Sequence, residues 1–148
     1  MPEKATLKRA RRDKRQGKAP STQAGEFVRE EIHHIREGKH GARSTKQAIA
    51  IGLSKARRAG VKLGTPKNAS AATRRSAKSA ARAGRKRARP SRRRSQAMLR
   101  RLKREGRAAG SSRALARQAR SAAKRRTRAS RKAAARKAAN TRRRRASA

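Results

Sequence analysis

The sequence predicts a mostly α-helical protein with large disorder, in which a small antiparallel αα-hairpin is followed by a long basic, low-complexity tail. Three observations support this fold class. The 148 residues include 49 Lys and Arg but only 7 Asp and Glu, which gives a formal net charge of +42. Apolar residues make up 32 % of the chain, most of them alanine, and Phe27 is the only aromatic residue. Because alanine buries little area, so charged a chain cannot offset its ordering entropy over its full length.

Charge and large apolar residues both divide the chain near Leu63. Residues 1–63 contain 17 basic and six acidic residues, a net charge of +11, whereas residues 64–148 contain 32 basic residues and one acid, a net charge of +31. We therefore expect a basic N-terminal arm over residues 1–20, a helical hairpin over residues 21–63, and an Arg/Ala-rich basic tail over residues 64–148. The tail is expected to be disordered or helical only on binding.

The N-terminal arm favours a helix over residues 3–17, which ends at Gly17 and is closed by Pro20. This segment holds one large apolar residue, Leu7, so we expect a solvated helix that frays.

The first hairpin helix is predicted over residues 22–37, with Ser21 or Thr22 as its N-cap and Gly38 in the C′ position. Its apolar stripe, at the helical spacing i, i+4 and i+7, consists of Val28, Ile32 and Ile35, with Ala24 one turn earlier and Phe27 beside it.

The second hairpin helix is predicted to begin at Ser44, with Gln47 three residues later as in a capping box, and to end at Gly60, with Val61 folding back on the last turn. Its apolar stripe consists of Ile49, Leu53 and Ala56. A strip of small residues beside it, which would let another helix approach closely, consists of Ala48, Gly52 and Ala59. Two helices joined by about six residues indicate an antiparallel hairpin, which could also self-associate.

The tail begins with a linker over residues 64–68 and is rich in Ala and Arg, which are good helix formers. Repulsion among like charges opposes a helix in free solution, and phosphates would remove that repulsion. A short helix over residues 95–104 would carry a small patch that could dock on the hairpin, formed by Met98, Leu99 and Leu102. A basic stripe at i, i+4, i+7 and i+11 is formed by Arg113, Arg117, Arg120 and Lys124.

The segment from Lys39 to Ala56 reads Lys-His-Gly-Ala-Arg-Ser-Thr-Lys-Gln-Ala-Ile-Ala-Ile-Gly-Leu-Ser-Lys-Ala. It resembles short uncharacterised bacterial proteins that share a Lys-His-Gly loop followed by a Lys-Gln-Ala-Ile-Ala-Ile helix, over residues 21–63 of this chain. That resemblance implies no established activity. The tail is similar in composition to the Ala/Lys/Arg tails of bacterial linker-histone-like proteins, although it holds 25 Arg to seven Lys and little proline.

The basic tail predicts binding to nucleic acid, because +31 greatly exceeds what solubility requires. Duplex DNA carries about one charge per ~1.7 Å, so the whole chain would neutralise roughly 42 phosphates. The scarcity of aromatic residues argues against base stacking and an RRM-type surface. We expect non-sequence-specific binding and compaction of duplex DNA, as in a histone-like, nucleoid-associated protein. The residues expected to contact phosphate are Arg74, Arg75, Arg85, Lys86, Arg87, Arg92, Arg93, Arg94, Arg100, Arg101, Arg113, Arg117, Arg120, Lys124, Arg125, Arg126, Arg142, Arg143, Arg144 and Arg145.

Charge alone does not separate DNA from RNA, so an RNA-binding or ribosome-associated basic protein is the alternative. A membrane-active polypeptide is disfavoured, because the tail lacks the bulky apolar face of interfacial helices. Two further Pro-containing turns, Thr65-Pro66-Lys67 and Arg89-Pro90-Ser91-Arg92, resemble minor-groove motifs only faintly.

The histidines His33, His34 and His40, with Glu30 or Glu37, raise the question of a metal. A zinc site needs three or four convergent ligands, whereas His33 and His34 are adjacent on a helix and point about 100° apart. We therefore expect no metal and no cofactor. No nucleophile and base are placed near a pocket-sized core, so we expect no enzyme.

The sequence has no cysteine, and hence no disulfide. It has no apolar run of transmembrane length and no apolar region typical of a secretory signal near its N-terminus. We expect a cytoplasmic, nucleoid-associated protein.

Overall fold

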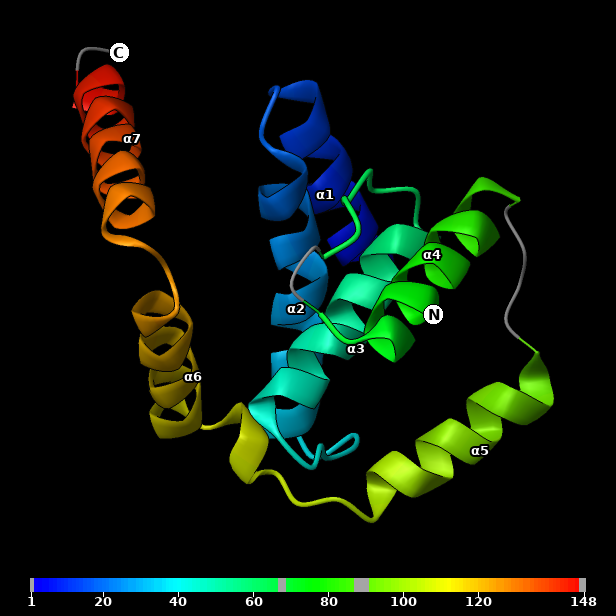
Figure 1. Ribbon diagram of the computed structural model, residues 1–148. Coiled ribbons are helices and arrows are strands. Elements are labelled where there is room, and N and C mark those ends of the chain that lie inside the picture. The colour runs from blue at the N-terminus through cyan, green and yellow to red at the C-terminus, as the bar shows by residue number, and fades with distance from the viewer. Residues whose placement is uncertain (1, 67–68, 87–90, 147–148) are drawn as a thin grey trace. The chain divides into compact units, whose positions relative to one another are not determined.

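The computed structural model of the protein describes residues 2–66, 69–86 and 91–146 (Figure 1). In these ranges the chain forms seven α-helices and one short 3-10 helix, and no strand. The helices are α1 (Lys4–Arg15), α2 (Pro20–Arg36), α3 (Thr45–Arg58), α4 (Ala71–Arg85), α5 (Arg92–Lys103), η1 (Ala108–Gly110), α6 (Ser112–Lys124) and α7 (Arg128–Ala146). Contacts divide the chain into one unit that ends at Ser111 and a second that begins at Ser112.

The expectation of a large disordered region with a long tail is wrong, because the described residues of that region form the helices α4 to α7. The prediction allowed only large apolar residues to form a core. In the structure, α4 packs on α3 and buries Ala77 and Ala80. A Cβ atom at Gly84 would lie 2.2 Å from the carbonyl oxygen of Arg57 in α3. Small side chains therefore let the backbones of α3 and α4 approach closely. This close packing stabilises the interface without large apolar side chains. Helix α4 is also capped, since Ser70 Oγ accepts a hydrogen bond from Thr73 N at 3.2 Å.

The N-terminal arm is likewise not the solvated, fraying helix that was expected. Helix α1 packs on α2 and buries Thr6, Ala10 and Asp13. Leu7 packs against the core cluster formed by Ala10, Ala24, Phe27 and Ala56. A single large apolar residue is sufficient here, because alanines and ion pairs make up the rest of the interface.

Pro20 begins a helix and does not simply close the previous one. It is the first residue of α2, and the N-cap is Ala19 where Ser21 or Thr22 was expected. The fixed φ of proline suits the first helical position, where its missing N–H is not needed. Helix α1 ends at Arg15 with Gln16 as its C-cap, and Gly17, at which the sequence predicted the end, has a left-handed φ of 66°.

Helices α2 and α3 pack on each other through small residues. The buried residues of α3 are Thr45, Ala48, Gly52 and Ala56. A Cβ atom at Gly52 would lie 2.7 Å from Val28 Cα in α2. The expected stripe residues Ile49 and Leu53 are only half-buried. Of the predicted strip of small residues, Ala48 and Gly52 are buried, whereas Ala59 is exposed. The helix that approaches Gly52 closely is α2, the first helix of the hairpin.

The ends of these two helices match the sequence-based expectations closely. Gly38 and Gly60 have φ values of 76° and 90°. After each glycine, the next amide bonds back to the helix, from Lys39 to His34 O at 2.9 Å and from Val61 to Ala56 O at 3.0 Å, as in the Schellman motif. Ser44 Oγ accepts from Gln47 N at 3.2 Å. The side chain of Gln47 accepts from Arg43 N, one residue before the position that a capping box uses.

Residues 102–111 complete the first unit. Gly41 N donates to Leu102 O at 2.9 Å, and Ala42 N donates to Gly106 O at 3.1 Å. Helix η1 contacts both α2 and α3. Of the apolar patch that was expected to dock on the hairpin, Leu102 is buried, whereas Met98 and Leu99 are exposed.

Among the helices of the described ranges, none combines the length and the apolar character needed to cross a bilayer.

Candidate functional site

The residues predicted to contact phosphate lie on or beside α4 to α7, and those whose side chains the structure describes are exposed. Arg87 lies outside the described residues, as does the side chain of Arg145. In the first unit the described residues are Arg74, Arg75, Arg85 and Lys86 on and just after α4, and Arg92, Arg93, Arg94, Arg100 and Arg101 on α5. In the second unit they are Arg113, Arg117, Arg120, Lys124, Arg125 and Arg126 on and after α6, and Arg142, Arg143 and Arg144 on α7.

Helix α6 has the most ordered arrangement of basic side chains. The stripe predicted from the sequence lies on one helical face, since positions i, i+4, i+7 and i+11 are aligned along a helix. A hollow of about 400 Å³ is lined by Arg117, Arg120, Ser121, Lys124 and Arg125. Three residues of the stripe, Arg117, Arg120 and Lys124, therefore line one hollow.

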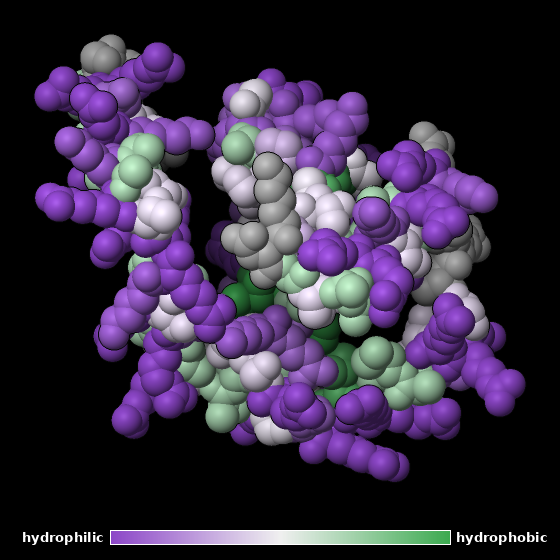
Figure 2. All heavy atoms as spheres, in the orientation of Figure 1, coloured by the Kyte–Doolittle hydropathy of each residue, from purple (hydrophilic) through white to green (hydrophobic). Residues whose placement is uncertain are grey.

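Most of the acidic residues form ion pairs within the first unit. Ion pairs in residues 3–55 involve six of the seven acids: Glu3, Asp13, Glu26, Glu30, Glu31 and Glu37. The seventh acid, Glu105, is the only one that the sequence holds after Leu63. The basic side chains of α4 to α7 therefore have almost no acidic residues of their own segment to pair with. Hydrophilic side chains cover most of the face seen in Figure 2, including those that project around α5 and α7.

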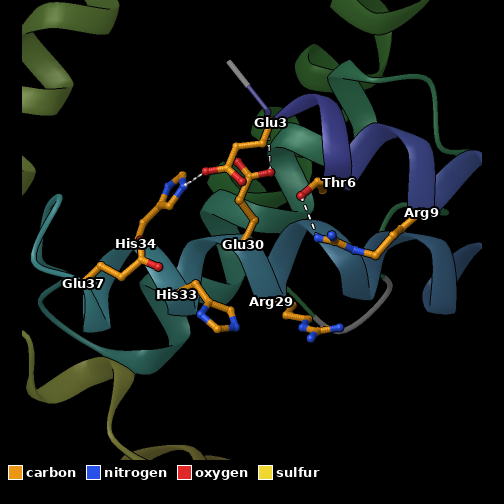
Figure 3. Close-up of a pocket in the computed structure, with 8 residues that line it drawn as sticks. All are labelled: Glu3, Thr6, Arg9, Arg29, Glu30, His33, His34 and Glu37. Carbon is orange, nitrogen blue, oxygen red and sulfur yellow. Dashed lines mark hydrogen bonds and ion pairs between the residues drawn. The ribbon is translucent and has the colours of Figure 1, made fainter.

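A second polar region lies where the start of α1 meets α2. A cavity of about 220 Å³ is lined by Glu3, Thr6, Arg9, Arg29, Glu30, His33, His34 and Glu37 (Figure 3). Glu3 N donates to Glu30 Oε2 at 3.1 Å, and Glu3 Oε1 lies 2.8 Å from His34 Nε2. The hydrogen bond from His34, together with Lys39, holds the pKa of Glu3 below its usual value. Glu37 in turn raises the pKa of Lys39 through a hydrogen bond.

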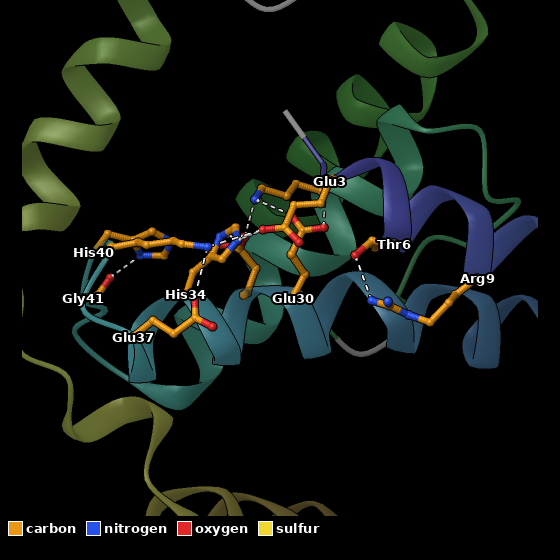
Figure 4. Close-up of polar contacts among 11 residues, drawn as sticks. Glu3, Thr6, Arg9, Glu30, His34, Glu37, His40 and Gly41 are labelled. Atoms are coloured by element: carbon orange, nitrogen blue, oxygen red, sulfur yellow. Dashed lines mark hydrogen bonds and ion pairs between the residues drawn. The ribbon is translucent and has the colours of Figure 1, made fainter.

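Beside this cavity, Glu31, His34 and His40 bring three potential ligand atoms within 4.8 Å of one another. His40 comes from the loop after α2 and points toward His34 (Figure 4). The two rings are 5.9 Å apart and nearly perpendicular. Lys55 of α3 contacts Glu30 at 3.3 Å and also forms an ion pair with Glu31.

This cluster differs from the set considered in the sequence. His33 is exposed, and neither Glu30 nor Glu37 belongs to the cluster. Glu31 is the residue that sequence reasoning missed. The available signal was its spacing, because Glu31 and His34 are three residues apart and so share one helical face.

Comparison with known proteins identifies one similarity. Residues 11–68 match a family of unknown function (DUF6496). The match covers residues 21–63, on which the resemblance to uncharacterised bacterial proteins is based. It agrees with an uncharacterised family and says nothing about the loop, the helix motif or the tail. No curated protein and no solved structure matches the chain.

Proposed function

We propose that this protein binds duplex DNA without sequence preference and compacts it by neutralising phosphates. The observation that carries the proposal is the exposure of the basic residues on α4 to α7, in a segment whose sequence holds one acid. Counterions released from DNA drive such binding, and their number grows with the number of phosphates contacted. The role is one of binding and not of catalysis, and it would place the protein with the bacterial nucleoid.

The duplex is favoured over single strands because the chain offers no stacking platform. Proteins that hold single strands stack bases on aromatic side chains. The only Phe, Tyr or Trp of this chain is Phe27, which is 1 % exposed in the core of the first unit.

Helix α6 illustrates how a duplex could be held. Arg113 and Lys124 are 11 residues apart, which corresponds to about 16 Å along a helix. The DNA major groove is about 12 Å wide, so one face of α6 is long enough to meet phosphates on both sides of it. Guanidinium groups bind phosphate with two parallel hydrogen bonds, which suits a surface in which Arg outnumbers Lys.

Compaction requires contact with more than one DNA segment. Basic helices occur in both units of the chain, α4 and α5 in the first and α6 and α7 in the second. One molecule therefore has two basic surfaces, and bridging does not depend on self-association through α2 and α3.

The test is a salt titration of the full chain on two unrelated DNA duplexes, one RNA duplex and one single strand. We expect equal affinity for the two DNA duplexes and a log–log salt slope of about −0.9 per contacted phosphate. A large difference between the two DNA duplexes would indicate base readout and contradict the proposal. Binding to the RNA duplex at least about tenfold tighter than to DNA would assign the protein to the RNA-binding class instead.

A further inference from the structure

We propose that Glu31, His34 and His40 form a binding site for one zinc ion, in contrast to the expectation from the sequence. The side chains are 1 %, 13 % and 8 % exposed, respectively. These three groups offer one ligand atom each to a single cation, away from water, in addition to the ion pair that Glu31 forms with Lys55.

The orientation of the two imidazoles supports the site. His34 Nε2 lies 2.8 Å from Glu3 Oε1, and His40 Nδ1 lies 3.0 Å from the carbonyl oxygen of Gly41. An ionised carboxylate and a carbonyl only accept hydrogen bonds, so these two nitrogens carry the protons. In a neutral imidazole the other nitrogen then has a lone pair and can bind a metal.

Both of these lone-pair nitrogens face Glu31. His34 Nδ1 lies 3.8 Å from Glu31 Oε1, and His40 Nε2 lies 3.7 Å from Glu31 Oε2. Zn–N and Zn–O bonds of about 2.0–2.1 Å in a tetrahedron place neighbouring ligand atoms about 3.3 Å apart. The two nitrogen–oxygen distances would thus have to shorten by about half an ångström, from an arrangement in which the three ligand atoms already lie within 4.8 Å of one another.

The donor set favours zinc over magnesium or calcium. Those two ions prefer oxygen ligands throughout, whereas two imidazoles and one carboxylate are a known zinc set that leaves a fourth position for water. The surroundings also match, because metal-binding histidines usually donate their second N–H to a carboxylate or a carbonyl. Glu3 and Gly41 fill these two roles here.

Zinc would join α2 to the loop that holds His40. That loop is bonded to residues 102–106 through Gly41 and Ala42, so the ion would strengthen the first unit. It would also lie beside the adjoining cavity, whose lining includes the acids Glu3, Glu30 and Glu37 together with Arg9 and Arg29.

The experiment is a titration of the full chain with zinc chloride, followed by calorimetry and by NMR of the imidazole nitrogens. We expect one zinc per chain, with coordination through Nδ1 of His34 and Nε2 of His40 and no change at His33. Zinc signals at His33, unchanged nitrogens at His34 and His40, or no binding up to millimolar zinc would each overturn the proposal.

Variants sharpen the test, and His33 provides a matched control. His34→Asn and His40→Asn should each weaken zinc binding by at least about tenfold, as should Glu3→Gln through its hydrogen bond to His34, since partners of ligands typically contribute 10–100-fold. His33→Asn should bind as the unmodified chain does. An equal loss in His33→Asn would contradict the site. Where a variant loses its helical circular dichroism, the NMR titration of the unmodified chain decides.

Discussion

Helices α1 and α6 carry the same pattern of positive charge in different surroundings. Basic residues at i, i+4, i+7 and i+11 are Lys4, Lys8, Arg11 and Arg15 on α1, and Arg113, Arg117, Arg120 and Lys124 on α6. All eight side chains are exposed. Around α1, however, Glu3, Asp13 and Glu26 form ion pairs, whereas no acid occurs in the sequence after Glu105.

The same number and spacing of basic residues therefore occur in two different electrostatic surroundings. The acids near α1 contribute an opposing field, and the ion pairs of Glu3 with His34 and of Glu26 with Arg9 join α1 to α2. The unit that contains α6 has no acidic residue in its sequence, so we expect phosphates to be attracted to α6 more strongly.

The largest expected effect comes from removing the basic stripe of α6, with removal of the matching basic residues of α1 as the comparison. Changing all four basic residues of the α6 stripe to Gln should reduce the salt slope by up to about 3.6, and the affinity for duplex DNA in 0.1 M salt by up to about three orders of magnitude. The same four changes on α1 should have a much smaller effect. Salt-dependent fluorescence anisotropy of both full-length variants checks this, and equal losses would break the comparison.

The next effect concerns the small-residue packing that holds α1 to α3 together. Gly52→Ala should destabilise the first unit by about 1–3 kcal/mol, because its Cβ would lie within 3.0 Å of backbone atoms of Val28 and Phe27. Gly25→Ala in α2 is the matched control. A Cβ atom there meets nothing within 4 Å, so this change should stabilise the helix by about 0.5–1 kcal/mol. Urea unfolding of each variant measures both values, and the same sign for the two would contradict the packing.

A smaller effect is expected when the positive charge of α6 is kept but the planar guanidinium groups are replaced. Replacing Arg113, Arg117 and Arg120 with Lys removes paired hydrogen bonds to phosphate. We expect affinity to fall by less than about tenfold while the salt slope stays within about one unit, since the number of contacted phosphates is unchanged. A collapse of the slope in this variant would show that α6 needs a specific arrangement of guanidinium groups.

The smallest effect tests the acids beside α1. The side chains of Arg9 and Glu26 form an ion pair and are 34 % and 20 % exposed. Glu26→Gln should cost less than about 1 kcal/mol of stability and should strengthen DNA binding slightly by removing a negative charge. Thermal unfolding and anisotropy measure the two quantities; weaker DNA binding in this variant would argue against an opposing field.

The sequence was most informative where local chemistry decides the structure. Glycine in a left-handed conformation and a Ser N-cap depend on a few neighbouring residues, which is why the ends of α2 and α3 at Gly38, Ser44 and Gly60 could be predicted. Packing between distant segments could not be predicted, because Ala77, Ala80 and Gly84 carry no periodic signal of large apolar residues. The structure shows where the basic residues lie on helices α4 to α7, whereas their binding to DNA remains a prediction.

The polar cluster was missed for a related reason. Glu31 and His34 share a helical face, but His40 reaches them only because Gly38 reverses the chain and the loop is held by residues 102–106. Neither event can be read from the spacing of the histidines. Helical geometry correctly excluded His33 as a neighbour of His34 in one cluster. It did not exclude a cluster that His34 forms with other residues.

The hydrogen bonds that the loop after α2 and the first residue of α3 make with residues 102–110 have a consequence for the order of folding. Thr45 Oγ1 donates to Ala109 O, 64 residues further along the chain. Helices α1, α2 and α3 are neighbours in sequence and can pair early, whereas contacts of such long range form slowly. Because domains generally fold from the N-terminus during synthesis, the first unit cannot be completed until residue 110 has left the ribosome. By then the strongly basic helices α4 and α5 have already emerged. Their positive charge is therefore exposed before the packing of the first unit is complete.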